Sequence, residues 1–296
     1  MGVLDELTDR RLTRPDGRTV AWTEWGDPAG VPLLRLPGTP GCRLSVRSDP
    51  TPWADRGLRV ITTERPGFGA STRLPGRGFA EHADDLAAVL DELGLDAVHV
   101  TGASGASAHE LCLAGRHPDR VRAMTVVAGG APTTAEESLQ EISINREAAE
   151  LVRSGDTAAL WRRLEEVYAQ FVADPLAGIA EVSDGVPAAD RAVMSAPAWQ
   201  LVFTAAVREA LRAGPDGWGD ETLALLGDWA DVDCSRVRTS LAWWHAPSDA
   251  DAPLPAAQRL LRGIPHAELR LFAADEGHLA AFHREGEILD ELLARG

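Results

Sequence analysis

The 296-residue chain contains no lysine, and this absence removes several chemistries at once. A lysine Schiff base, a lysine-bound pyridoxal phosphate and the phosphate-binding lysine of a P-loop all need an amine that the chain lacks. All 29 basic residues are therefore arginine, against 45 acidic residues, and the formal net charge is −16. Such a chain has little positive charge with which to displace counterions from nucleic acid. We expect neither nucleic acid nor a membrane surface as a partner.

Cysteine is also scarce, because Cys42, Cys112 and Cys234 are far apart and form no CxxC spacing. This pattern argues against a disulfide framework and is typical of small buried thiols in a reducing compartment. No apolar run is long enough to cross a bilayer, and the first residues lack the basic and apolar regions of a secretory signal. The eight histidines show no metal-ligand spacing. We therefore expect a cytoplasmic location and neither a metal nor another cofactor.

The first half of the chain alternates apolar runs with helical patterns. Strands are predicted at 19–25, 32–36, 59–63, 97–101 and 121–127, and helices at 43–56 (interrupted near two prolines), 79–93 and 108–117. The short runs before the helices are apolar throughout, as strands buried on both faces are. This rhythm predicts an α/β fold with a mostly parallel, doubly wound sheet.

Near Pro132 the alternation stops, and it resumes with predicted strands at 240–245 and 268–272. Between them, helices are predicted at 136–154, 157–171, 188–194, 199–213 and 221–229. We expect residues 133–235 to form a helical cap, inserted into an α/β core that consists of residues 1–132 and 236–296. Four tryptophans fall in this insertion: Trp161, Trp199, Trp218 and Trp229. Either they bury the inner face of the cap, or some of them line an apolar substrate pocket.

A run of small residues, Gly-Ala-Ser-Gly-Ala at 102–106, joins a predicted strand to a predicted helix. Small residues two positions before and after Ser104 let strand and helix approach closely, which can hold the serine in a strained, exposed turn. The pattern predicts that Ser104 is a nucleophile. A serine hydroxyl needs a base to remove its proton, and the base works best when a carboxylate orients it.

Candidates for the base and the acid follow the last two predicted strands, where side chains of a parallel sheet converge. Asp249 follows strand 240–245, and His278 follows strand 268–272. Asp251 is only two residues from Asp249 and is a second candidate for the acid. The resulting chain order of serine, aspartate and histidine is the order expected of one particular fold.

These segments together resemble the α/β-hydrolase fold superfamily, and in particular its serine hydrolases with a helical cap. Residues 102–106 correspond to the nucleophile elbow, 37–41 to the oxyanion loop and 64–71 to the Asp-x-x-Gly-x-Gly-x-Ser segment. Asp249 with Pro253 matches the acid turn, and Gly277-His278 matches the histidine loop. The match runs from about residue 18 to the end of the chain.

The resemblance implies a role for each matching residue. Ser104 would attack the substrate, His278 would accept and return the proton, and Asp249 would hold the imidazole. The backbone N–H groups of Thr39 and Gly105 would form the oxyanion hole.

Five positions depart from the family's pattern. Pro37 replaces the histidine of the oxyanion loop, Glu64 an aspartate, Ala106 and Ser107 two glycines, and Ala246 the glycine of the acid turn. The amide of Thr39 survives, so the oxyanion hole can still form. Ser107 is either a packing residue or a second hydroxyl at the site.

The resemblance implies hydrolysis of a small, apolar ester, lactone or thioester through an acyl-serine intermediate, with a small molecule as substrate. A prolyl-type aminopeptidase, a carbon–carbon bond hydrolase and a cofactor-free perhydrolase would share the same three residues. A non-catalytic ligand-binding homologue is the alternative from another class, and Pro37 is its only support. Serine at position 104 disfavours epoxide hydrolases and haloalkane dehalogenases, which need an aspartate there.

Overall fold

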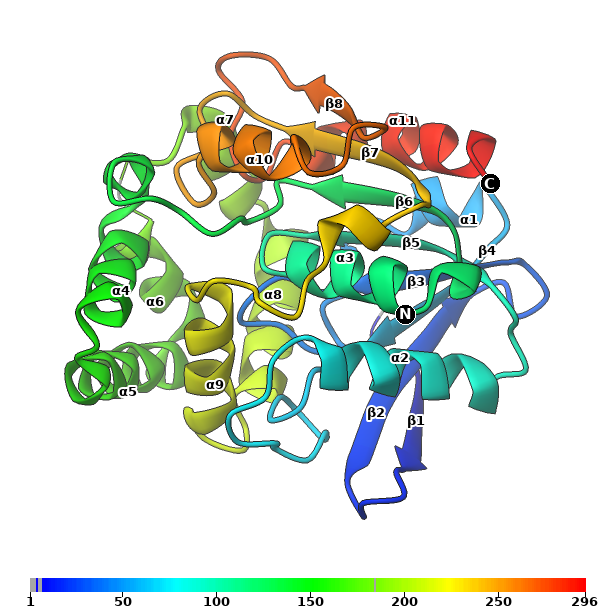
Figure 1. The fold of residues 1–296 in the computed structure, drawn as a ribbon, viewed down its shortest axis with the longest axis horizontal. Coiled ribbons are helices and arrows are strands. Elements are labelled where there is room, and N and C mark those ends of the chain that lie inside the picture. Colours follow the sequence, from blue (N-terminus) through cyan, green and yellow to red (C-terminus); the bar gives the residue numbers. More distant parts are fainter. Residues whose placement is uncertain (1–3, 5–6, 184) are drawn as a thin grey trace.

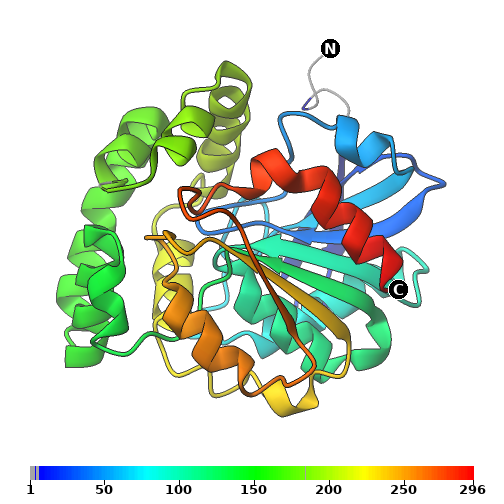
Figure 2. The same cartoon turned by 90° about the horizontal axis from the view of Figure 1, so that it is seen from above.

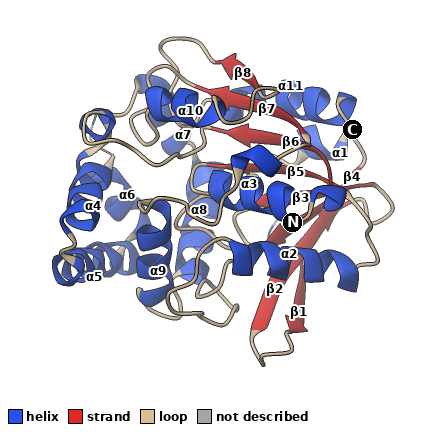
Figure 3. Cartoon of the chain, in the orientation of Figure 1, coloured by secondary structure: helices blue, strands red, loops and turns tan. Residues whose placement is uncertain are grey.

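The computed structural model describes residues 4, 7–183 and 185–296. These residues form an eight-stranded sheet with helices on both faces (Figures 1 and 3). The strands are β1 (Thr8–Thr13), β2 (Thr19–Gly26), β3 (Val31–Leu36), β4 (Leu58–Thr63), β5 (Val98–Ala103), β6 (Val121–Val127), β7 (Ser240–His245) and β8 (Glu268–Leu271). Their order is β1-β2-β4-β3-β5-β6-β7-β8, antiparallel over the first three and parallel over the rest. The predicted α/β class with a mostly parallel sheet is confirmed.

Two sets of helices cover the sheet, which lies between them in Figure 2. On one face lie α2 (Ala80–Glu92), α3 (Ala106–Arg116) and α10 (Leu254–Leu261), and on the other α1 (Thr51–Ala54) and α11 (Ala281–Ala294). The central strands are buried by both sets, which is why they read as continuous apolar runs. Val98 and Val100 of β5, for example, belong to the same core cluster as Leu111 of α3.

Between β6 and β7 the chain forms a block of helices beyond the carboxyl ends of the parallel strands (Figures 1 and 2). The helical block consists of α4 (Ser143–Ser154), α5 (Thr157–Ala173), α6 (Pro175–Val182), α7 (Ala188–Met194), α8 (Pro197–Ala210) and α9 (Asp216–Leu225). It has an apolar cluster of its own, which includes Leu160, Phe171 and Trp218. Within the described residues, no helix has both the length and the apolar character that crossing a membrane requires.

The predicted helix at 43–56 is wrong, because only Thr51–Ala54 is helical there. Arg43 forms ion pairs with acidic residues of three separate segments, and Arg47 pairs with Glu285 of α11. An irregular chain lets these two arginines reach partners in different directions, and Pro50 and Pro52 restrict the helix that follows.

The predicted helix at 136–154 is broken into a 3₁₀ turn, Glu137–Gln140, and α4. At the break, the backbone N–H of Ile142 donates to the carbonyl of Ala250, 2.7 Å away in the loop after β7. A bond to another part of the chain therefore replaces the helical bond at this point, and Glu141 is held beside the strand ends.

Candidate active site

Ser104 lies in the sharp turn between β5 and α3. Its φ angle is +60°, a conformation that costs energy for a residue with a side chain. The turn is fixed because the Ser104 N–H donates to the Val127 carbonyl and its own carbonyl accepts from the Gly130 N–H, each at 3.1 Å. A Cβ at Gly102 would lie 2.7 Å from that of Ala106, so strand and helix approach as closely as the small residues predict.

His278 and Asp249 lie in the loops after β8 and β7 and are bonded to each other. The imidazole Nδ1 of His278 is 2.9 Å and 3.0 Å from the two carboxylate oxygens of Asp249. Oδ1 of Asp249 also accepts the backbone N–H groups of Asp251 and Ala252, each at 2.9 Å. The Asp249 side chain is fully buried, and these bonds fix the orientation of the imidazole.

Three carboxylates surround His278. Burial disfavours the imidazolium, but the negative charges of Asp249, Asp251 and Asp190 and the hydrogen bond that Asp249 accepts from the ring outweigh it and raise the pKa of His278 above its usual range. Asp190 belongs to α7, and its carboxylate accepts the backbone N–H of Leu279 at 3.1 Å. The protonated, cationic form of His278 is therefore stabilised by these carboxylates.

Ser104 opens onto a cavity of about 200 Å³ between the strand ends and the helical block. Its lining includes Thr39, Gly105 and Asp251, and a carboxylate oxygen of Asp251 lies within 4.8 Å of the His278 ring nitrogen. Most of the wall is apolar and comes from the helical block: Ile144, Ala148, Leu164, Val167, Phe171, Ile179, Val182, Trp218 and Leu225. The volume lies below the roughly 300–1,000 Å³ of sites for drug-sized ligands, which favours a small substrate.

The four tryptophans of the helical segment lie in different surroundings. Trp218 and Trp229 line the cavity. Trp199 instead stacks on Phe203 with ring centroids 4.5 Å apart, and the ring of Trp161 fills the space in front of Gly219.

The loop at residues 37–41, which corresponds by resemblance to the family's oxyanion loop, is held by an arginine that sequence reasoning missed. The guanidinium of Arg65 donates to the carbonyl oxygens of Pro37 and Gly38 at 2.8 and 2.6 Å. A Cβ at Gly105 would lie 2.5 Å from the Thr39 hydroxyl, so the side chain of Thr39 lies directly against Gly105, the residue after Ser104. The loop therefore has a fixed shape without the histidine that Pro37 replaces.

Glu221 of α9, which sequence reasoning also missed, connects this loop to the helical block. Its Oε1 accepts the Thr39 hydroxyl at 3.3 Å and the Nε2–H of His109 at 3.0 Å. Arg65 lies 3.3 Å away, and Arg77 pairs with Oε2. Although Glu221 is completely buried, these cations keep the pKa of its carboxyl well below the usual range.

Two buried histidines complete this network. Burial lowers the pKa of His109 to about 4 and that of His82 well below its usual range, so both are neutral. Their Nδ1 atoms are 2.9 Å apart. Because His109 donates from Nε2 to Glu221, its Nδ1 is the acceptor, and the Nδ1–H of His82 is the donor.

A model of the alpha/beta hydrolase fold matches residues 31–226. The chain belongs to the alpha/beta hydrolase family. Rhodomycin D methylesterase DnrP of Streptomyces peucetius is 30% identical over 84% of this chain and 85% of its own length. Rhodomycin D methylesterase DauP of Streptomyces sp. (strain C5) is 39% identical, but the match covers only 42% of this chain and 43% of that protein.

Among solved structures, a thermophilic esterase from Thermogutta terrifontis shares the fold with a TM-score of 0.67 and 20% sequence identity. The alignment covers 97% of this chain and 98% of that one. The predicted resemblance is confirmed, and the protein is a hydrolase of the alpha/beta fold.

Two departures from the family's pattern have a structural explanation. Glu64, in place of the usual aspartate, is buried, accepts the N–H groups of Ala70 and Ser71 and pairs with Arg43. Ser107 donates its hydroxyl to the Gly130 carbonyl at 2.7 Å, so this side chain is engaged in holding the elbow. The structure favours the packing interpretation of Ser107.

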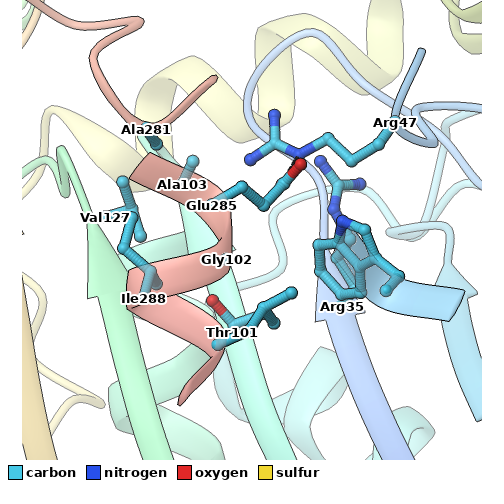
Figure 4. A pocket seen from close by; sticks show the side chains of 11 residues that line it. Arg35, Arg47, Thr101, Gly102, Ala103, Val127, Ala281, Glu285 and Ile288 are labelled. Carbon is cyan, nitrogen blue, oxygen red and sulfur yellow. Dashed lines mark hydrogen bonds and ion pairs between the residues drawn. The ribbon is translucent and has the colours of Figure 1, made fainter. Parts of the chain in front are cut away.

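A second, much smaller cavity lies between the end of β5 and α11 (Figure 4). It measures about 20 Å³ and is lined by Thr101, Gly102 and Ala103 of β5, by Arg35 and Arg47, and by Glu285 of α11. This is room for about one water molecule. This cavity is therefore too small to hold a substrate.

Proposed function

We propose that this protein is a serine hydrolase that cleaves a small, apolar carboxylic ester, lactone or thioester through an acyl-serine intermediate. Ser104 is the nucleophile, His278 the general base and Asp249 the residue that orients it. The observation that carries the proposal is the strained Ser104, which opens onto an apolar cavity at the edge of the sheet where the bonded Asp249–His278 pair also lies.

The chemistry follows from which atoms are free to react. Asp249 occupies Nδ1 of His278, which leaves Nε2 to take the Ser104 proton while the serine oxygen bonds to the substrate carbonyl carbon. The N–H groups of Thr39 and Gly105 stabilise the oxyanion, at roughly 3 kcal/mol each. His278 then gives the proton to the leaving oxygen as the acyl bond breaks, and a water activated in the same way releases the acid and restores the serine.

The surroundings of the site support this substrate class. We propose that residues 133–235, which include the helical block, form a cap over the site. The helical block supplies an apolar wall to the cavity. Both named relatives are methylesterases by name, which makes methyl esters suitable test substrates. A peptide or carbon–carbon bond would be cleaved by the same three residues, so the substrate panel has to include both.

Labelling with a fluorophosphonate probe tests the nucleophile. The wild-type protein should be labelled rapidly, Ser104→Ala should not be labelled, and His278→Ala should be labelled slowly. Ser154→Ala is a matched control, because this serine lies at an exposed position of α4 and its loss does not affect the turn at Ser104. An unreactive Ser104 in the folded wild type would refute the proposal. Hydrolysis of methyl and p-nitrophenyl esters, compared with aminoacyl anilides and with a β-diketone as the carbon–carbon substrate, then identifies the bond.

A further inference from the structure

The larger cavity contains a carboxylate with one oxygen that has no hydrogen-bond partner among the described residues. Glu141 lines the cavity and is 7% exposed, and its Oε2 atom is buried without a hydrogen-bond partner among the described residues. Its position is fixed from both sides of the helix break. Ile142 donates to Ala250, and the side-chain amide of Asn145 donates to the Asp251 carbonyl at 3.2 Å. Glu141 is therefore held against the loop that carries Asp249.

The described residues that line the cavity include no positively charged side chain to balance the charge of this carboxylate. Among the described residues that line it, none is arginine, lysine or histidine, and the other acidic residue is Asp251. Burying a carboxyl group without a partner costs several kcal/mol or forces it to take up a proton. An apolar side chain in this apolar wall would avoid that cost, so the presence of a carboxylate indicates a ligand that supplies the missing charge.

We propose that Glu141 binds a protonated amine, so that the preferred substrates are apolar esters with an ammonium group away from the scissile carbonyl. This inference rests on the proposed function, since it names the substrate class of the same site. An ammonium group has three N–H donors and no acceptor, and it would satisfy Oε2 of Glu141 with a charge-assisted hydrogen bond. The negative charge of Asp251 on the same wall favours the same ligand.

The ionisation of Glu141 agrees with this role. The pKa of its carboxyl is raised to about 7, mainly by burial; among the charged groups that face it, Arg153 and Arg146 lower the pKa, while Asp251 and Glu137 raise it. A bound cation would favour the charged form. The preference for an amino ester over a neutral ester should therefore increase as the pH rises through about 7. His278 acts on both esters, so its own titration cancels in this ratio.

Two esters of nearly equal shape test the proposal: methyl 6-aminohexanoate and methyl heptanoate. The measured quantity is the ratio of their kcat/KM values, amino over neutral. Glu141→Gln should lower this ratio by about ten- to a hundredfold, as the loss of a hydrogen bond between charged groups does. Glu150→Gln, which removes the same charge from an exposed position of α4, should leave the ratio unchanged. An unchanged ratio in folded Glu141→Gln would overturn the proposal.

Binding of hexylamine, measured by calorimetry on Ser104→Ala, separates this inference from the proposed function. Saturable binding that Glu141→Gln abolishes supports the amine site even if no ester is cleaved. Hydrolysis of both esters without any binding of hexylamine would overturn the amine site and leave the hydrolase intact. If Glu141→Gln fails to fold, the wild-type ratio decides: a ratio that does not rise through pH 7 contradicts the proposal.

Discussion

Glu221 and Glu141 both lie between β6 and β7 in the chain and are both buried, yet their surroundings differ completely. Glu221 has Arg65, Arg77, His109 and the Thr39 hydroxyl within bonding or ion-pair distance. Glu141 has no partner for Oε2 in the described part of the chain. One carboxyl therefore has its pKa held far below the usual range, and the other has its pKa raised to about 7.

The difference shows how to distinguish a structural charge from a functional one. A buried ion that is fully compensated costs most when it is removed, because its partners are left uncompensated. A buried ion without partners costs most when it is present, and a protein retains it at the expense of stability. We infer that Glu221 holds the oxyanion loop and that Glu141 is available to a ligand.

The largest effect is expected at the acid turn. Asp249 accepts donors from His278, Asp251 and Ala252, whereas Asp251 faces the cavity. Asp249→Asn should lower kcat on a methyl ester by on the order of 10³–10⁴, because the imidazole loses the partner that orients it. Asp251→Asn should retain most of the activity. The reverse result would reassign the acid to Asp251.

The Asp251→Asn variant should also shift the pH dependence of kcat/KM. His278 must be neutral to accept a proton, and the surrounding carboxylates raise its pKa, so kcat/KM should rise with pH through a pKa above the usual histidine range. Asp251→Asn removes one of these negative charges. The rising limb of its pH profile should therefore lie at lower pH than in the wild type.

The next largest effect is expected for Glu221→Gln. The amide keeps the shape of the side chain but leaves Arg65 and Arg77 buried without a counter-charge. We expect a loss of about 3–5 kcal/mol in the free energy of unfolding, measured by urea denaturation at neutral pH. Glu165→Gln, at an exposed position of α5, is the matched control and should change stability little. A loss no larger than that of the control would mean that the contacts of Glu221 do not stabilise the loop at residues 37–41.

Much of the fold is predictable from the sequence, because buried parallel strands must be apolar throughout. The predicted bounds of β6 and β7 coincide with those observed, Val121–Val127 and Ser240–His245. Helix α6 was missed because its Asp-Pro start resembles a helix breaker. In the structure, Asp174 caps this helix with its side chain, and Pro175 occupies the first turn, where a missing N–H does no harm.

The sequence predicts only those residues of the candidate site that directly follow a strand. Ser104, Asp249 and His278 each follow a strand, so the topology of a parallel sheet brings their loops together, and their catalytic roles remain proposals. Arg65 and Glu221 matter through contacts between segments far apart in the chain, and no local pattern marks them. Glu141 lies inside a predicted helix, and only the bond from Ile142 to Ala250 breaks that helix and holds Glu141 at the cavity.

The smallest effect concerns the stability of Glu141→Gln and has the opposite sign to that of Glu221→Gln. The folded protein raises the pKa of Glu141 from 4.5 to about 7. Between these values the folded state holds a proton that the unfolded state has lost, so this group destabilises the protein increasingly as the pH rises through that window. Glutamine does not titrate. The variant should therefore match the wild type at pH 5 and exceed it by roughly 1–3 kcal/mol at pH 8, from urea unfolding at both pH values. Glu150→Gln should show no such pH dependence, and a Glu141→Gln variant less stable at pH 8 than the wild type would show that this carboxylate is compensated after all.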